Sequence, residues 1–143
     1  MAYLMSGQIS ELDRLQMQSL VWEDAGARLL NEICDGTGLH TLDVGCGSLG
    51  WLRLLSRWVG LNGICIGTEI ADSMVVVARQ FCSSENLEND QVVIDDLFES
   101  ALLSHSFDLV HARFQLAPIG SFEDQIECYS KLLNPGGILS LNC

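Results

Sequence analysis

Short apolar segments alternate with segments of helical periodicity from residue 39 onward, and this alternation limits the fold more than any other feature. The apolar segments lack the in/out striping of half-exposed strands, which is typical of strands buried on both faces of a parallel sheet. Parallel neighbours need crossover connections, and right-handed crossovers place helices on both faces. We therefore predict an α/β fold with a doubly wound sheet. The expected strands are residues 41–44, 63–69, 91–94, 107–112 and 138–141.

The segments between these strands carry helix signals. Residues 49–59 place apolar side chains on one helical face, and Asp72 and Ser121 are the expected N-caps of two further helices. Residues 134–137 (NPGG) are expected to end the last helix before the fifth strand.

The chain outside this alternating region is also predicted to be helical. Apolar residues recur close to helical spacing in the first forty residues, so we expect residues 1–38 to form a helical lid and residues 39–143 to form the ligand-binding core. The sequence stops directly after the fifth predicted strand. Because an open strand edge needs cover, we expect either that a second copy of the chain or a partner chain pairs with it, or that the sequence is a fragment.

Nineteen acidic residues against seven basic ones give the chain a formal charge of −12. A surface of this charge repels the phosphate backbone, so nucleic acid is not an expected partner. The same surface attracts a cationic ligand.

Compartment signals are few. The longest apolar run, residues 74–78, is far too short to cross a membrane, and the N-terminus lacks the basic and apolar regions of a secretory signal. The six cysteines form no C-x-x-C pair and have no histidine at zinc-site spacing, so we expect reduced thiols and no metal site. These features favour a cytoplasmic protein.

Polar and acidic residues follow four of the predicted strands. Ligands of open parallel sheets bind beyond the carboxyl ends of the strands, next to the first strand. The chemistry is therefore expected at residues 43–50, Glu69, Asp95 to Asp96 and residues 111–115.

A glycine-rich turn follows the first strand, with Gly45, Gly47 and Gly50 spaced as G-x-G-x-x-G. This spacing, with Glu69 at the distance expected for a ribose contact, is compatible with a nicotinamide dinucleotide site. Asp43, however, would oppose a pyrophosphate and suits a ligand that carries an ammonium and a sulfonium. In the alternative interpretation, Asp43 only caps or braces the turn.

Five segments, in order along the chain, resemble the class I S-adenosylmethionine-dependent methyltransferases. The resemblance implies a Rossmann-like sheet with strand order 3-2-1-4-5, and a sequence that lacks the last two of the family's seven strands. The third glycine of the turn, Gly50, lies one position later than usual in the family. The five segments are residues 42–47 (LDVGCG), 67–71 (GTEIA), 93–97 (VIDDL), 107–110 (FDLV) and 132–137 (LLNPGG).

The resemblance implies S-adenosylmethionine as cofactor and a role for residues at each strand end. Glu69 is expected to accept hydrogen bonds from both ribose hydroxyls, and either Asp95 or Asp96 to accept one from the adenine amino group. Asp43 is expected near the ammonium of the methionine part, through water. The expected cofactor-binding residues are Tyr3, Asp43, Gly45, Cys46, Gly47, Glu69, Ile70, Asp95, Asp96, Leu97 and Ala112.

Methyl transfer needs a base only when the acceptor must lose a proton. His111, near the end of the fourth strand, is the candidate, because imidazole titrates near neutral pH. The alternative is a hydrogen-bonded histidine of the core.

The function implied by the resemblance is methyl transfer from S-adenosylmethionine to a small organic acceptor. Three alternatives remain: a cofactor-binding but non-catalytic partner subunit or fragment, a small NAD(P)-binding reductase, and a methyltransferase fold used for other chemistry.

Overall fold

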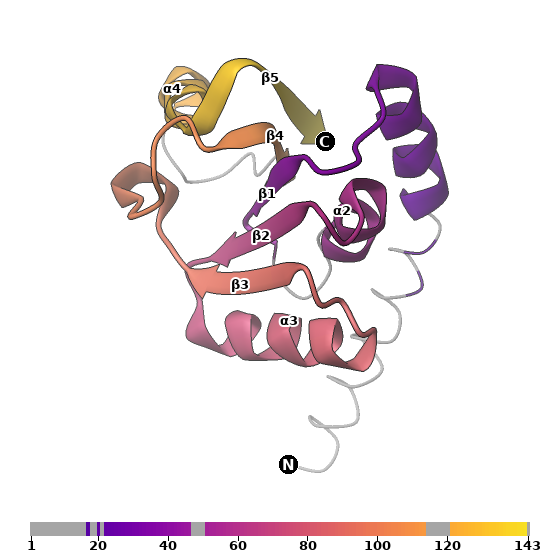
Figure 1. The fold of residues 1–143 in the computed structure, drawn as a ribbon. Coiled ribbons are helices and arrows are strands. Elements are labelled where there is room, and N and C mark those ends of the chain that lie inside the picture. The colour runs from indigo at the N-terminus through magenta and orange to yellow at the C-terminus, as the bar shows by residue number, and fades with distance from the viewer. Residues whose placement is uncertain (1–16, 18–19, 21, 47–50, 114–120, 143) are drawn as a thin grey trace.

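The computed structural model describes residues 22–46, 51–113 and 121–142, together with Met17 and Leu20. Five strands form one sheet in the order β3-β2-β1-β4-β5, and all neighbouring pairs are parallel (Figure 1). The predicted fold class and strand order are therefore confirmed. The strands are β1 (His40–Val44), β2 (Ile64–Glu69), β3 (Asp90–Ile94), β4 (Phe107–Arg113) and β5 (Leu133–Asn142).

Three helices and a short 3-10 turn connect the strands. Ser121 caps α4 as predicted, because its hydroxyl accepts a hydrogen bond from the Asp124 N–H at 3.1 Å. The predicted cap at Asp72 is wrong: Ala71 is the N-cap of α3, and Asp72 lies in the first turn, where its charge complements the helix dipole. The elements are α2 (Leu52–Val59), α3 (Asp72–Ser84), η1 (Leu97–Glu99) and α4 (Phe122–Leu132).

Strand β5 begins five residues earlier than the sequence predicts. Leu133 already pairs with Phe107, and a register shift between Phe107 and Leu109 follows before Ile138 pairs with Leu109. The predicted turn at residues 134–137 therefore lies inside β5, where Gly136 has a φ of +79°. A glycine accommodates this left-handed backbone without steric cost.

Both faces of the sheet are buried, which explains the continuous apolar runs. Leu109 and Cys65 pack with α2 and α3 on one face. Leu42, Val110 and Ala112 pack with α4 on the other face. Asp43 and His111 alternate with these residues and belong to the face that α2 covers.

Residues 22–33 are helical and pack on α2 (Figure 1). Leu30 is fully buried in the same core as α2, and the Arg53 guanidinium bridges Glu23 at 2.9 Å and Glu85 at 3.1 Å. That residues 1–38 form a lid stays a prediction. Within the described ranges, no helix is both long enough and apolar enough to cross a membrane.

Candidate functional site

The turn after β1 begins in a conformation that glycine favours. Gly45 has a φ of +64°, and the N–H of Cys46 donates to the carbonyl oxygen of Thr68 at 2.9 Å, which ties the turn to β2. A Cβ at Gly67 would lie 2.9 Å from the Cys46 sulfur and 2.7 Å from a Leu52 methyl carbon. Glycine at position 67 therefore lets the turn and α2 approach the sheet closely.

Asp43 is buried below this turn, on the α2 face of the sheet. Its Oδ2 accepts a hydrogen bond from the Trp51 N–H at 2.6 Å, and its Oδ1 accepts one from His111 Nδ1–H at 2.8 Å. Only 1% of the residue is exposed. This is the environment of the alternative interpretation, in which Asp43 braces the turn.

His111 has no solvent exposure, and its ring stacks on the indole of Trp51 with centroids 3.8 Å apart and an interplanar angle of 6°. Its Nε2 has no hydrogen-bond partner among the described residues. These surroundings are those of a hydrogen-bonded core histidine. The catalytic role of His111 stays a prediction.

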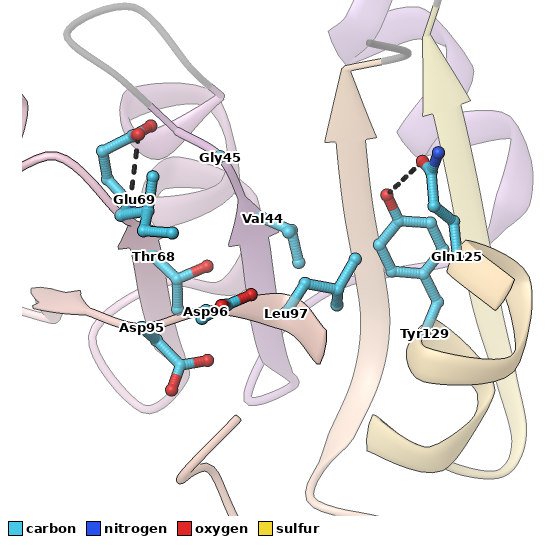
Figure 2. Close-up of a pocket in the computed structure, with 10 residues that line it drawn as sticks. Val44, Gly45, Thr68, Glu69, Asp95, Asp96, Leu97, Gln125 and Tyr129 are labelled. Carbon is cyan, nitrogen blue, oxygen red and sulfur yellow. Dashed lines mark hydrogen bonds between the residues drawn. The ribbon is translucent and has the colours of Figure 1, made fainter. Parts of the chain in front are cut away.

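A cavity of about 170 Å³ lies at the carboxyl ends of the strands (Figure 2). Val44 lines it, so the cavity lies on the face of β1 opposite to that of Asp43. Six of the expected cofactor-binding residues line it. Of the others, Asp43, Cys46 and Ala112 are buried elsewhere, and Tyr3 and Gly47 lie outside the described residues. The lining residues are Val44, Gly45, Thr68, Glu69, Ile70, Asp95, Asp96, Leu97, Gln125 and Tyr129.

Glu69 ends β2 at this cavity. Its Oε1 accepts hydrogen bonds from the N–H groups of Ile70 at 3.1 Å and Ala71 at 3.5 Å. The two backbone N–H groups between β2 and α3 therefore fix the position of the carboxylate.

The two adjacent aspartates after β3 differ in their contacts. Both oxygens of Asp95 are occupied within their own loop, since they accept from the Ser100 hydroxyl at 2.6 Å and from the Ala101 N–H at 2.9 Å. Asp96 caps η1 through a single oxygen, Oδ1, which accepts from the Phe98 N–H at 3.0 Å. Among the described residues, Asp96 thus accepts through one oxygen, while both oxygens of Asp95 hold the loop.

Gln125 and Tyr129 form the opposite wall of the cavity, and neither is among the expected cofactor-binding residues. The Tyr129 hydroxyl donates to the Gln125 Oε1 at 3.5 Å, and Figure 2 shows the pair across the cavity from the three acids. Burial raises the pKa of Tyr129, so the hydroxyl stays protonated and neutral. One signal was available: Gln125 is a polar residue four positions before Tyr129 on a mostly apolar helix face.

A family model described as "Methyltransferase domain" matches residues 41–137, more than half of the chain. The chain belongs to the methyltransferase domain family. The resemblance to class I S-adenosylmethionine-dependent methyltransferases is thereby confirmed.

Individual family members are similar over much of this methyltransferase domain. Demethylmenaquinone methyltransferase of Staphylococcus aureus (strain MRSA252) is 29% identical over 122 residues, which are 85% of this chain and 48% of that protein. The chain therefore spans about half the length of the curated relatives it matches.

Two solved structures have the same fold. A SAM-dependent methyltransferase from Aquifex aeolicus matches with a TM-score of 0.78 and 21% identity, over 92% of this chain and 70% of that one. Phosphoethanolamine N-methyltransferase 2 of Haemonchus contortus, solved with S-adenosyl-L-methionine, matches with a TM-score of 0.62 and 24% identity, over 72% of this chain and 24% of that one.

Proposed function

We propose that this domain binds S-adenosylmethionine in the cavity at the carboxyl ends of β1, β2 and β3, and transfers its methyl group to a small organic acceptor. One observation carries the proposal: Gly45, Glu69 and Asp96, from the ends of three neighbouring strands, line one cavity. This nucleoside needs three groups: a glycine backbone beside its methionine part, a carboxylate for the ribose diol, and a carboxylate for the adenine amino group. Gly45, Glu69 and Asp96 provide them in that order.

The contacts assign a part of the cofactor to each acid. Glu69, held by the N–H groups of Ile70 and Ala71 directly before α3, accepts from the ribose hydroxyls. Of the two aspartates we assign Asp96, with one oxygen outside the η1 cap, to the adenine amino group. The side chains of Ile70 and Leu97 line the cavity beside these acids and supply apolar surface for the base.

S-adenosylmethionine supplies a methyl group on a sulfonium, which a nucleophile displaces in line. The residues of the chain bind and orient the nucleoside and exclude water from it, and alignment of this kind contributes a large share of such rate enhancements. The charge of the cavity suits a cationic ligand, because Glu69, Asp95 and Asp96 line it and no Lys or Arg is among its described lining residues.

The relatives support a small-molecule acceptor. The name of the Staphylococcus aureus relative specifies demethylmenaquinone, a small organic molecule. We infer an acceptor of that general class, a small molecule rather than a nucleic acid, in keeping with the net charge of −12.

A second candidate is a cofactor-binding partner subunit. It is favoured by β5, which pairs with β4 on one side and with no described strand on the other. Light scattering during size-exclusion chromatography tests it: a homodimer or a copurified partner supports edge pairing, whereas a monomer at high concentration contradicts it.

We also propose a cytoplasmic location, because the five cysteines in the described ranges carry free thiols.

Calorimetric titration tests the proposed function. S-adenosylhomocysteine should bind the wild-type protein, and NADH should not. Glu69→Ala should lower the affinity by about 1.5–3 kcal/mol, the value of a lost pair of charge-assisted hydrogen bonds. Glu99→Gln, which neutralises an exposed acid of η1, is the matched control and should bind normally. Binding of NADH in place of S-adenosylhomocysteine would favour the reductase alternative.

A further inference from the structure

Three residues form a closed ring of contacts that joins both ends of the glycine-rich turn. Asp43, at the end of β1, bonds the backbone N–H of Trp51 at 2.6 Å, directly before α2. The indole of Trp51 stacks on the imidazole of His111 in β4, with ring centroids 3.8 Å apart. His111 Nδ1–H donates a hydrogen bond to the other oxygen of Asp43 at 2.8 Å. The start and the end of the turn are thus held to each other and to β4.

This ring is a costly way to fill a core. Asp43 and His111 are 1% and 0% exposed. Two aromatic nitrogens of these residues, Nε2 of the His111 imidazole and Nε1 of the Trp51 indole, have no hydrogen-bond partner within the described ranges. Buried polar groups without partners destabilise a folded protein, and apolar residues of similar volume often serve a core better. Packing alone therefore does not account for the ring.

We propose that His111 is a positioning residue for cofactor binding, which acts through Asp43 on the glycine-rich turn. The Nδ1–H of His111 fixes the rotamer of Asp43, so that the second carboxylate oxygen meets the Trp51 N–H. The Trp51 ring closes on the imidazole from the other side. With both ends of the turn fixed, Gly45 stays at the cavity in the conformation that the cofactor needs, and binding spends little free energy on ordering it.

The inference deepens the proposed function and rests on it, because the effect is read out as cofactor affinity. It also develops the alternatives that the sequence left open for His111 and Asp43, in place of a base and an ammonium contact. His111 acts from the core through a hydrogen bond, and Asp43 braces the turn from below rather than facing the ammonium.

Four variants test the proposal, each titrated with S-adenosylhomocysteine and unfolded thermally. His111→Phe keeps an aromatic ring against Trp51 and removes the Nδ1–H. His111→Asn keeps an N–H donor near the same position and removes the ring. Trp51→Leu keeps the backbone N–H and removes the stack, and it replaces His111→Phe as the decisive variant if that protein does not fold. Val59→Ala, a fully buried residue at the far end of α2, is the control for lost stability.

The expected result is a loss of affinity of at least about tenfold for His111→Phe, because Asp43 no longer holds the two ends of the turn and binding must then order them. His111→Asn should recover most of that affinity, Trp51→Leu should bind several-fold more weakly than wild type, and Val59→Ala should bind normally despite its lower unfolding temperature. Rescue by asparagine separates positioning from packing, because asparagine restores the donor but not the ring.

Other outcomes overturn the proposal. If His111→Phe and Trp51→Leu bind as tightly as wild type, or lose affinity only in proportion to stability as Val59→Ala does, the ring is purely structural. If His111→Asn binds no better than His111→Phe, the hydrogen bond does not matter. If the wild-type protein itself fails to bind S-adenosylhomocysteine, the proposed function is refuted, and this inference falls with it.

Discussion

Asp90 is an acid whose burial opposes its ionisation, and its replacement should stabilise the protein at alkaline pH. Burial raises the pKa of Asp90 from 3.8 to about 7, and the nearby side chains of Ser56, Cys82 (thiol at 3.8 Å) and Cys65 offset only part of this effect. Its Oδ1 is buried without a hydrogen-bond partner among the described residues. The neighbouring Cys82 thiol, with a pKa raised by burial to about 12, stays neutral throughout the relevant range.

The sign of the effect follows from linkage. Because the folded state binds the proton of Asp90 more tightly than the unfolded state does, this stability is fully present below pH 3.8 and is lost as the pH rises to about 7. Three pH units at about 1.4 kcal/mol each set an upper limit of about 4 kcal/mol. Local relaxation reduces that limit, so we expect Asp90→Asn to raise the free energy of unfolding by about 1–3 kcal/mol at pH 8.

Urea unfolding of wild type and Asp90→Asn at pH 5 and pH 8 measures this difference. The gain at pH 5 should be less than half of the gain at pH 8, since the folded protein already carries a protonated Asp90 at the lower pH. Glu88→Gln removes an equal charge from an exposed position two residues away and should change little at either pH. A loss of stability in Asp90→Asn at pH 8, or an equal gain at both pH values, would refute the reasoning.

Three further predictions concern the frame of the site. Gly67→Ala places a Cβ 2.7 Å from a Leu52 methyl carbon and should lower the free energy of unfolding in urea by about 1–3 kcal/mol. An unchanged midpoint would mean that α2 can move away from the sheet without loss of stability. Arg53→Met leaves Glu23 and Glu85 without their cation and should lower the free energy of unfolding by about 2–3 kcal/mol. Hydrogen exchange in residues 22–33 should become faster. Asp96→Ala should weaken S-adenosylhomocysteine binding by about 1–2 kcal/mol in calorimetry, and normal binding would remove Asp96 from the adenine site.

The strands were predictable because their signal is local. Each buried strand is a short, continuous apolar run between helix and turn signals, so their number, parallel arrangement and approximate limits followed from the sequence. The start of β5 was not predictable in this way. Residues 134–137 carry strong turn chemistry, and only pairing of Leu133 with Phe107 across the sheet places them inside a strand.

The acids at the strand ends were also predictable, because parallel topology brings those ends together. Glu69, Asp95 and Asp96 line one cavity, and their contact with a cofactor stays a prediction. The sequence could not tell which face of β1 receives the side chain of Asp43, nor that His111 meets it across 68 residues of chain. Gln125 was missed because tertiary packing decides which side chains of α4 face the cavity. Helical periodicity alone does not contain that information.

A structure of crystals grown or soaked with S-adenosylhomocysteine tests the central claim most directly. The account predicts density for the nucleoside in the cavity, with the ribose hydroxyls within hydrogen-bond distance of Glu69 and the adenine amino group at Asp96. A well-ordered protein with no ligand density beside Gly45 and Glu69 at saturating ligand, or with the ligand bound elsewhere, would contradict it.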